Sequence, residues 1–109
     1  MKLGTDYCMR QIKIPNETYL VIKHYCKNNR ISLIYFYETM LDWFLNEHRQ
    51  QNTLVYQAST KHRRTLSLWI RRRQIDLINK MATNAKVSDA RVIYTAMMLY
   101  LENLPELTA

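Results

Sequence analysis

A run of basic side chains is the part of this sequence with the clearest chemical meaning. Six Lys and Arg residues flank the short segment 65–70, with no acidic residue among them: Lys61, Arg63, Arg64, Arg71, Arg72 and Arg73. Basic side chains that cluster in this way attract polyanions such as nucleic acids. The whole chain agrees in sign, since 16 Lys+Arg against 9 Asp+Glu give a formal net charge of +7. The run therefore predicts phosphate contacts rather than a charged face that only meets solvent.

No set of residues has the spacing of a catalytic or metal-binding centre. His24 lies near Cys26, but no second Cys/His pair follows at the spacing that zinc sites use. The sequence also lacks a glycine-rich phosphate loop, a nucleophile elbow and an H-E-x-x-H motif. We therefore expect no enzyme activity, no metal and no cofactor.

The strands and helices that must position the basic side chains are expected to occur twice along the chain. Ser32 and Ser88 each begin a helical pattern and lie 56 residues apart (88 − 32). Shifting the first half by that distance aligns the apolar positions of the two halves without a gap. Self-similarity of this kind predicts two copies of one structural unit. We place the first copy at 8–46 and the second at 64–104, joined by a linker at 47–63.

Each copy begins with a short strand. Apolar and polar residues alternate over 11–14 and over 65–70, which is typical of a strand with one buried face. Pro15 ends the first strand and pre-sets the opening turn of a helix. Arg71 takes that place in the second copy, so we expect the second strand to end less sharply.

A first helix follows each strand. In the first copy Tyr19, Ile22 and Cys26 recur at spacings of three and four, which indicates one apolar helix face. We expect residues 28–29, and Asn84 in the second copy, to end this helix in the left-handed conformation.

A second helix completes each copy. Ser32 and Ser88 are good N-caps, because a serine side chain can accept a backbone N–H of the first turn. We expect the two helices to run to about Asn46 and to Asn103.

A unit of one strand and two short helices cannot fold alone, since its strand has no partner for its backbone groups. We therefore expect the two strands to pair antiparallel, with Gln11 opposite Ser67 and Lys13 opposite Thr65. The four helices then interlock beneath them as one domain. The linker is expected to be mostly irregular, with residues 54–56 packing locally.

This order of elements, with Pro15, Asn16 and Glu17 after the strand, resembles the ribbon-helix-helix family of DNA-binding proteins, which includes Arc- and MetJ-type repressors. The resemblance covers most of the chain twice, and two units in one chain resemble the TraY-type conjugation proteins. It implies a mainly α fold, in which two ribbon-helix-helix units form a pseudo-symmetric intramolecular dimer with a two-stranded antiparallel ribbon and four helices. The sequence departs from the family at Arg71 and in lacking the glycine that is common between the helices.

The resemblance implies a role for each face of the ribbon, which in this family enters the major groove. The inward side chains fill the core, and here they are Ile12, Ile14, Leu68 and Ile70. The outward side chains read bases, and here they are Met9, Gln11, Lys13, Thr65, Ser67 and Trp69. The chemistry agrees in part, because Gln can bond adenine, Lys can donate to guanine, and Ser or Thr can serve either.

Two tryptophans have separate expected places. Trp69 is expected to contact a thymine methyl group or a sugar. The alternatives are that it folds over the edge of the ribbon, or that the strand register is shifted by one residue. Trp43 is expected in the core or in an interface.

The resemblance also implies phosphate contacts at the N-terminus of each second helix, where free N–H groups favour an anion. The matching positions are Ser32 and Leu33, and Ser88 with Asp89, whose charge would weaken the second anchor. With the basic run, the expected phosphate contacts are Ser32, Leu33, Ser88, Lys61, Arg63, Arg64, Arg71, Arg72 and Arg73.

The function expected from these features is sequence-specific binding of double-stranded DNA by a small repressor or autoregulator. Two or more chains would associate on adjacent subsites. One alternative is a relaxosome accessory protein at a conjugative origin of transfer. Another is a protein-binding module that uses the aromatic residues of the second helices: Tyr35, Tyr37, Trp43 and Tyr94.

The cellular setting follows from what the sequence lacks. Two cysteines make no disulfide framework, no apolar run has the length of a membrane span, and the first ten residues lack the apolar core of a signal peptide. We therefore expect a cytoplasmic protein with no membrane partner and no small-molecule substrate.

Overall fold

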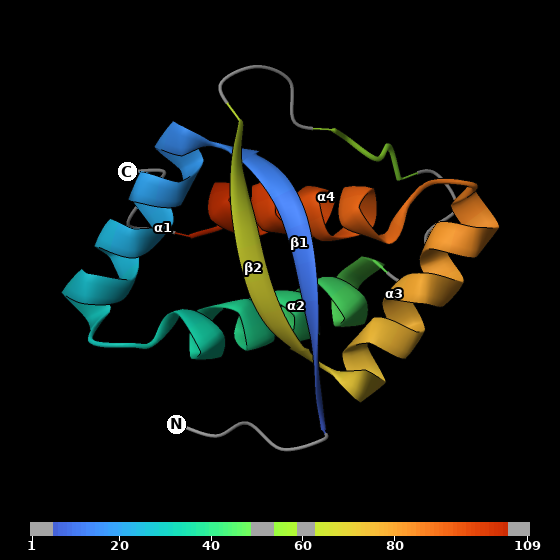
Figure 1. Ribbon diagram of the computed structural model, residues 1–109, viewed down its shortest axis with the longest axis horizontal. Helices are drawn as coiled ribbons and strands as arrows, with labels where there is room; N and C mark the ends of the chain where they lie inside the picture. The colour runs from blue at the N-terminus through green and yellow to red at the C-terminus, as the bar shows by residue number, and fades with distance from the viewer. Residues whose placement is uncertain (1–5, 49–53, 59–62, 105–109) are drawn as a thin grey trace.

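The computed structural model describes residues 6–48, 54–58 and 63–104 (Figure 1). Along the chain the elements are β1 (Tyr7–Pro15), α1 (Asn16–Asn29), α2 (Leu33–His48), β2 (Arg63–Arg71), α3 (Arg72–Ala85) and α4 (Asp89–Glu102). The fold is mainly helical, with one two-stranded antiparallel sheet. At this level the expected fold class is confirmed.

The elements of the two halves have matching bounds. Each element of the second half begins 56 residues after its counterpart, so β2 follows β1, α3 follows α1 and α4 follows α2 at one constant distance. Both strands have 9 residues, and α1 and α3 have 14 each.

The two strands end at equivalent positions, so the expectation that the second would end less sharply was wrong. Pro15 and Arg71 both precede a helix in the extended conformation, with φ of −62° and −64°. Any residue can adopt this backbone conformation, so proline is not needed. The N–H that Arg71 has and Pro15 lacks is bonded to the side-chain Oε1 of Gln74 at 3.2 Å.

The turns between helices also match, but not at the predicted residues. The left-handed residue is Arg30 in the first half, with φ of 56°, and Lys86 in the second, with φ of 58°. The asparagines remain within α1 and α3. In both turns the next residue, Ile31 or Val87, is half-buried against the core and donates its N–H back to the helix at 3.0 Å. This apolar contact sets the turn, as in other helix C-termini of this type.

Both serine caps are confirmed. The Oγ of Ser32 accepts the N–H of Tyr35 at 3.0 Å, and the Oγ of Ser88 accepts the N–H of Arg91 at 3.2 Å. Helix α4 ends before Asn103 as expected, whereas α2 continues to His48, beyond the predicted end.

The register of the ribbon is the predicted one, with Gln11 opposite Ser67 and Lys13 opposite Thr65. The predicted inward side chains are all buried: Ile12, Ile14, Leu68 and Ile70. Behind the ribbon lie α2 and α4, while α1 and α3 flank it on opposite sides (Figure 1). The central helices supply the largest core side chains, including Phe36, Met40, Phe44, Ile93 and Met97. The ribbon therefore has one face in the core and one in solvent.

Part of the linker packs on α4. Leu54 and Tyr56 are half-buried against the core, which confirms local packing for these two, while Val55 is exposed. The backbone N–H of Gln57 donates to the hydroxyl of the buried Thr95 at 2.8 Å. Among the described residues, no helix combines the length and the apolar character required to cross a membrane.

Candidate nucleic-acid interface

The solvent face of the ribbon carries three cross-strand pairs. We call this surface the outer ribbon face and define it by Met9, Gln11, Lys13, Thr65, Ser67 and Trp69, all of which are exposed. At its centre Gln11 faces Ser67, with Nε2 at 3.5 Å from the serine Oγ. Toward one end the Nζ of Lys13 donates to the Oγ1 of Thr65 at 2.6 Å. The structure thus brings the six predicted base-reading residues onto one surface.

The two serine-capped helix N-termini lie on opposite sides of the ribbon (Figure 1). Helix α2 begins on the side of α1, and α4 begins on the side of α3. The first N–H groups of any helix have no acceptor within it and carry the positive end of the helix dipole. Each terminus has the chemistry to hold an anion.

The acidic residue at the second of these termini is paired. The Oδ2 of Asp89 accepts a hydrogen bond from the Nε of Arg10 at 3.1 Å. Arg10 lies in β1 on the strand face opposite to that of Gln11. This ion pair offsets part of the repulsion that Asp89 would exert on a phosphate.

Arg71, predicted as a phosphate contact, already has anionic partners within the chain. Its guanidinium is bonded to the carboxylates of Glu38 and Asp6 and lies 4.8 Å from the ring centroid of Tyr7. A phosphate would have to compete with two carboxylates for this side chain.

Arg73 is paired in the same way. Its two terminal nitrogens lie 2.8 and 3.1 Å from the two carboxylate oxygens of Asp42. These hydrogen bonds lower the pKa of Asp42 below its usual value, and Asp42 raises the pKa of Arg73. The pair is therefore charged at neutral pH, and its contribution is lost only as the pH falls through the pKa of Asp42.

The other predicted phosphate contacts differ in their surroundings. Arg64 is exposed, lies 3.9 Å above the ring centroid of Tyr19, and donates to the side-chain oxygen of Asn16 at 3.4 Å. Arg72 is exposed at the first position of α3. Lys61 and the side chain of Arg63 lie outside the described residues.

One residue of this region was not singled out from the sequence. The Gln74 side chain is fully buried, and its Nε2 donates to the backbone oxygen of Glu38 and to the Oδ1 of Asp42, both at 2.9 Å. Its Oε1 accepts the N–H of Arg71. A glutamine three residues after a helix cap is a capping-box signal, so the sequence contained a sign of this role.

The four aromatic residues of the second helices that were expected to form a protein-binding surface do not share one exposed surface. Tyr37 and Tyr94 are buried, and Trp43 is half-buried, with its ring 5.5 Å from that of Tyr100. Of the four candidate aromatic residues, Tyr35 alone is exposed.

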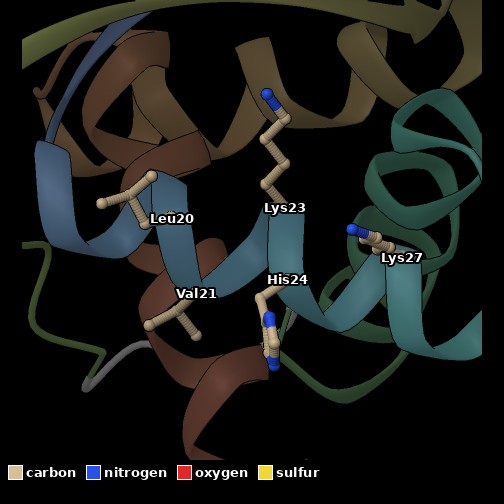
Figure 2. A pocket seen from close by; sticks show the side chains of 5 residues that line it. All are labelled: Leu20, Val21, Lys23, His24 and Lys27. Carbon is tan, nitrogen blue, oxygen red and sulfur yellow. The ribbon is translucent and has the colours of Figure 1, made fainter.

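A second surface feature lies on α1, where a shallow hollow is lined by Leu20, Val21, Lys23, His24 and Lys27 (Figure 2). Leu20 is 52% exposed. The equivalent position of α3 holds Asp76, so the exposed apolar side chain of Leu20 has no counterpart in the second half.

Within the described ranges, no three His, Cys, Asp or Glu side chains are grouped to hold a metal ion. Comparisons of the chain with protein-family models, with curated proteins and with solved structures found no match.

Proposed function

We propose that this protein binds double-stranded DNA and reads its sequence by placing the outer ribbon face in the major groove. The observation that carries the proposal is the exposed antiparallel ribbon with its polar cross-strand pairs. The major groove admits a two-stranded ribbon. Gln11 and Ser67, with Lys13 and Thr65, supply donors and acceptors suited to base edges.

The finer architecture belongs to the same proposal. Each half is one ribbon-helix-helix unit, and the two units form a pseudo-symmetric dimer within one chain. The constant spacing of the elements, the two left-handed residues and the two serine caps all support this.

Phosphate contacts would hold the ribbon in place. The N-termini of α2 and α4 flank the ribbon and would each receive a phosphate of the DNA backbone. Arg64, beside the start of α1, and Arg72, at the start of α3, would add charge at the two ends of the ribbon. Arg71 and Arg73 would contribute less, because carboxylates hold them. The biological role would be that of a cytoplasmic repressor or autoregulator, or of a relaxosome accessory protein, and the bound sequence separates the two.

The test begins with selection of duplexes from random DNA at physiological salt. We expect one preferred sequence, and we expect Gln11→Ala and Lys13→Ala to weaken its binding by about 1–3 kcal/mol each. Binding to unrelated DNA should change little with Gln11→Ala, because a base contact carries the effect. Equilibrium titration of labelled duplexes measures the affinity for the selected sequence and the affinity for unrelated DNA.

Lys80→Ala is the matched control, because it removes the same charge from an exposed position on α3. Lys80→Ala should change the affinity for the selected sequence and the affinity for unrelated DNA by the same factor. If Gln11→Ala and Lys13→Ala leave binding to the selected sequence intact, the ribbon does not read the DNA.

A further inference from the structure

The two ends of the outer ribbon face differ in chemistry. From the central pair of Gln11 and Ser67, one direction leads to Lys13 and Thr65. The other leads to Met9 and Trp69, which lie directly opposite each other. These are 42% and 41% exposed, and no other large apolar side chain of the described strands is as open to solvent.

The core does not require this apolar pair. The opposite face of the strands is closed by buried Leu68 and Ile70. Beyond the pair lie Tyr7 and Arg71, and the charge of Arg71 is bound by carboxylates of Glu38 and Asp6. This end of the ribbon thus presents an apolar surface, while the Lys13 end presents a cation.

We propose that Met9 and Trp69 form a subsite for the C5-methyl group of thymine, an inference that rests on the proposed function. Among the groups on the base edges of the major groove, the thymine methyl is the apolar one. An apolar pair on a ribbon in that groove is therefore complementary to thymine. Lys13, at the other end, is complementary to the O6 and N7 acceptors of guanine.

The register gives the distance between the two subsites. Met9 and Lys13 are four residues apart on β1, which is about 14 Å along a strand. Base pairs of B-DNA are spaced about 3.4 Å along the helix axis. The thymine that meets Trp69 should lie within about four base pairs of the guanine that meets Lys13.

Replacing thymine by deoxyuridine tests this, because it removes only the methyl group. In the selected duplex, each thymine is replaced in turn. We expect affinity to fall about fourfold at one or two positions, the effect of losing one buried methyl-sized group. Replacing guanine by 7-deazaguanine should weaken binding at the other end of the site.

Variants assign the effect to a side chain. Trp69→Ala should abolish the difference between thymine and uracil, and Met9→Ala should reduce it. Lys13→Ala is the matched control. For this variant, replacing thymine by uracil should lower the affinity as much as it does for the unchanged protein, whereas replacing guanine by 7-deazaguanine should no longer lower it. Thermal unfolding of each variant verifies that the ribbon is intact.

Three results would overturn the inference. If no thymine responds to uracil while Gln11→Ala and Lys13→Ala still weaken binding, the subsite is absent and the proposed function stands. If Trp69→Ala weakens thymine and uracil duplexes equally, the ring contacts a sugar or a stacked base instead. If the protein shows no salt-dependent binding to any duplex, the proposed function fails and the subsite fails with it.

Discussion

The arginines of the basic run show how neighbours from elsewhere in the chain decide what a side chain is free to bind. In the sequence this run contains no acid. In the fold, Glu38 and Asp42 of α2 reach Arg71 and Arg73 across more than 30 positions of the chain. Periodicity locates a charge on a helix face, but it does not reveal which residues of another helix pack against it. The pairing of the arginines was therefore outside what the sequence could predict.

A prediction at this scale compares Arg64 with Arg73. Arg64 rests on neutral groups of Tyr19 and Asn16, so its charge is available to a phosphate. We expect Arg64→Ala to weaken binding to all DNA sequences alike and to reduce the slope of log affinity against log salt by about one. Arg73→Ala should change that slope less, because Asp42 neutralises the arginine in the free protein. Titrations at several salt concentrations measure the slopes.

Arg73→Ala should instead reduce the free energy of unfolding, since it leaves Asp42 without its cation. A larger change of slope for Arg73→Ala than for Arg64→Ala would contradict this assignment of roles.

At the scale of elements, the sequence predicted well those features that depend on the periodicity of apolar residues. Alternation over 11–14 and 65–70 located the middle of both strands and their buried faces, although the strands extend over 7–15 and 63–71. The serines marked the helix starts. The helix ends were misplaced because asparagine is merely a frequent left-handed residue, whereas burial of Ile31 and Val87 determines where the chain turns. A left-handed Arg or Lys costs about 1–2 kcal/mol relative to a right-handed one, which the backbone hydrogen bonds of each turn help to offset.

The prediction at this scale concerns the contribution of Gln74 to stability. Its fully buried side chain donates two hydrogen bonds to Glu38 and Asp42 of α2. It also accepts the N–H of Arg71 at the start of α3. We expect Gln74→Met, which keeps the approximate volume, to reduce the free energy of unfolding by about 1–3 kcal/mol, because buried polar groups of Glu38 and Arg71 lose their partner. Urea unfolding measures the change.

Thr18 is the equivalent residue of α1 and provides the control. It is only half-buried, so Thr18→Val should change stability by less than the substitution at Gln74. Equal losses at the two positions would show that the hydrogen bonds of Gln74 have no special weight.

At the scale of the whole molecule, the two halves share a backbone plan but not a surface. The repeat made the plan predictable from 109 residues, together with the register that gathers the candidate site. The differences between the halves lie in side chains: Gln74 and its partners join α3 to α2, and the ribbon has a polar end and an apolar end. A ribbon with unequal ends that binds DNA as proposed would do so in one orientation and would prefer a sequence that is not a palindrome.

Orientation can be measured with a pair of matched labels. Asn28 and Asn84 are the same residue type, are both exposed, and hold equivalent positions on α1 and α3, which lie on opposite sides of the ribbon (Figure 1). Each would be replaced by cysteine, in a chain whose own Cys8 and Cys26 are changed to serine and alanine, and would carry an iron chelate that cleaves nearby DNA. We expect the label at 28 to cleave one flank of the selected site and the label at 84 to cleave the other. If each label cleaves both flanks equally, the protein binds in both orientations, and the difference between the ribbon ends does not direct binding.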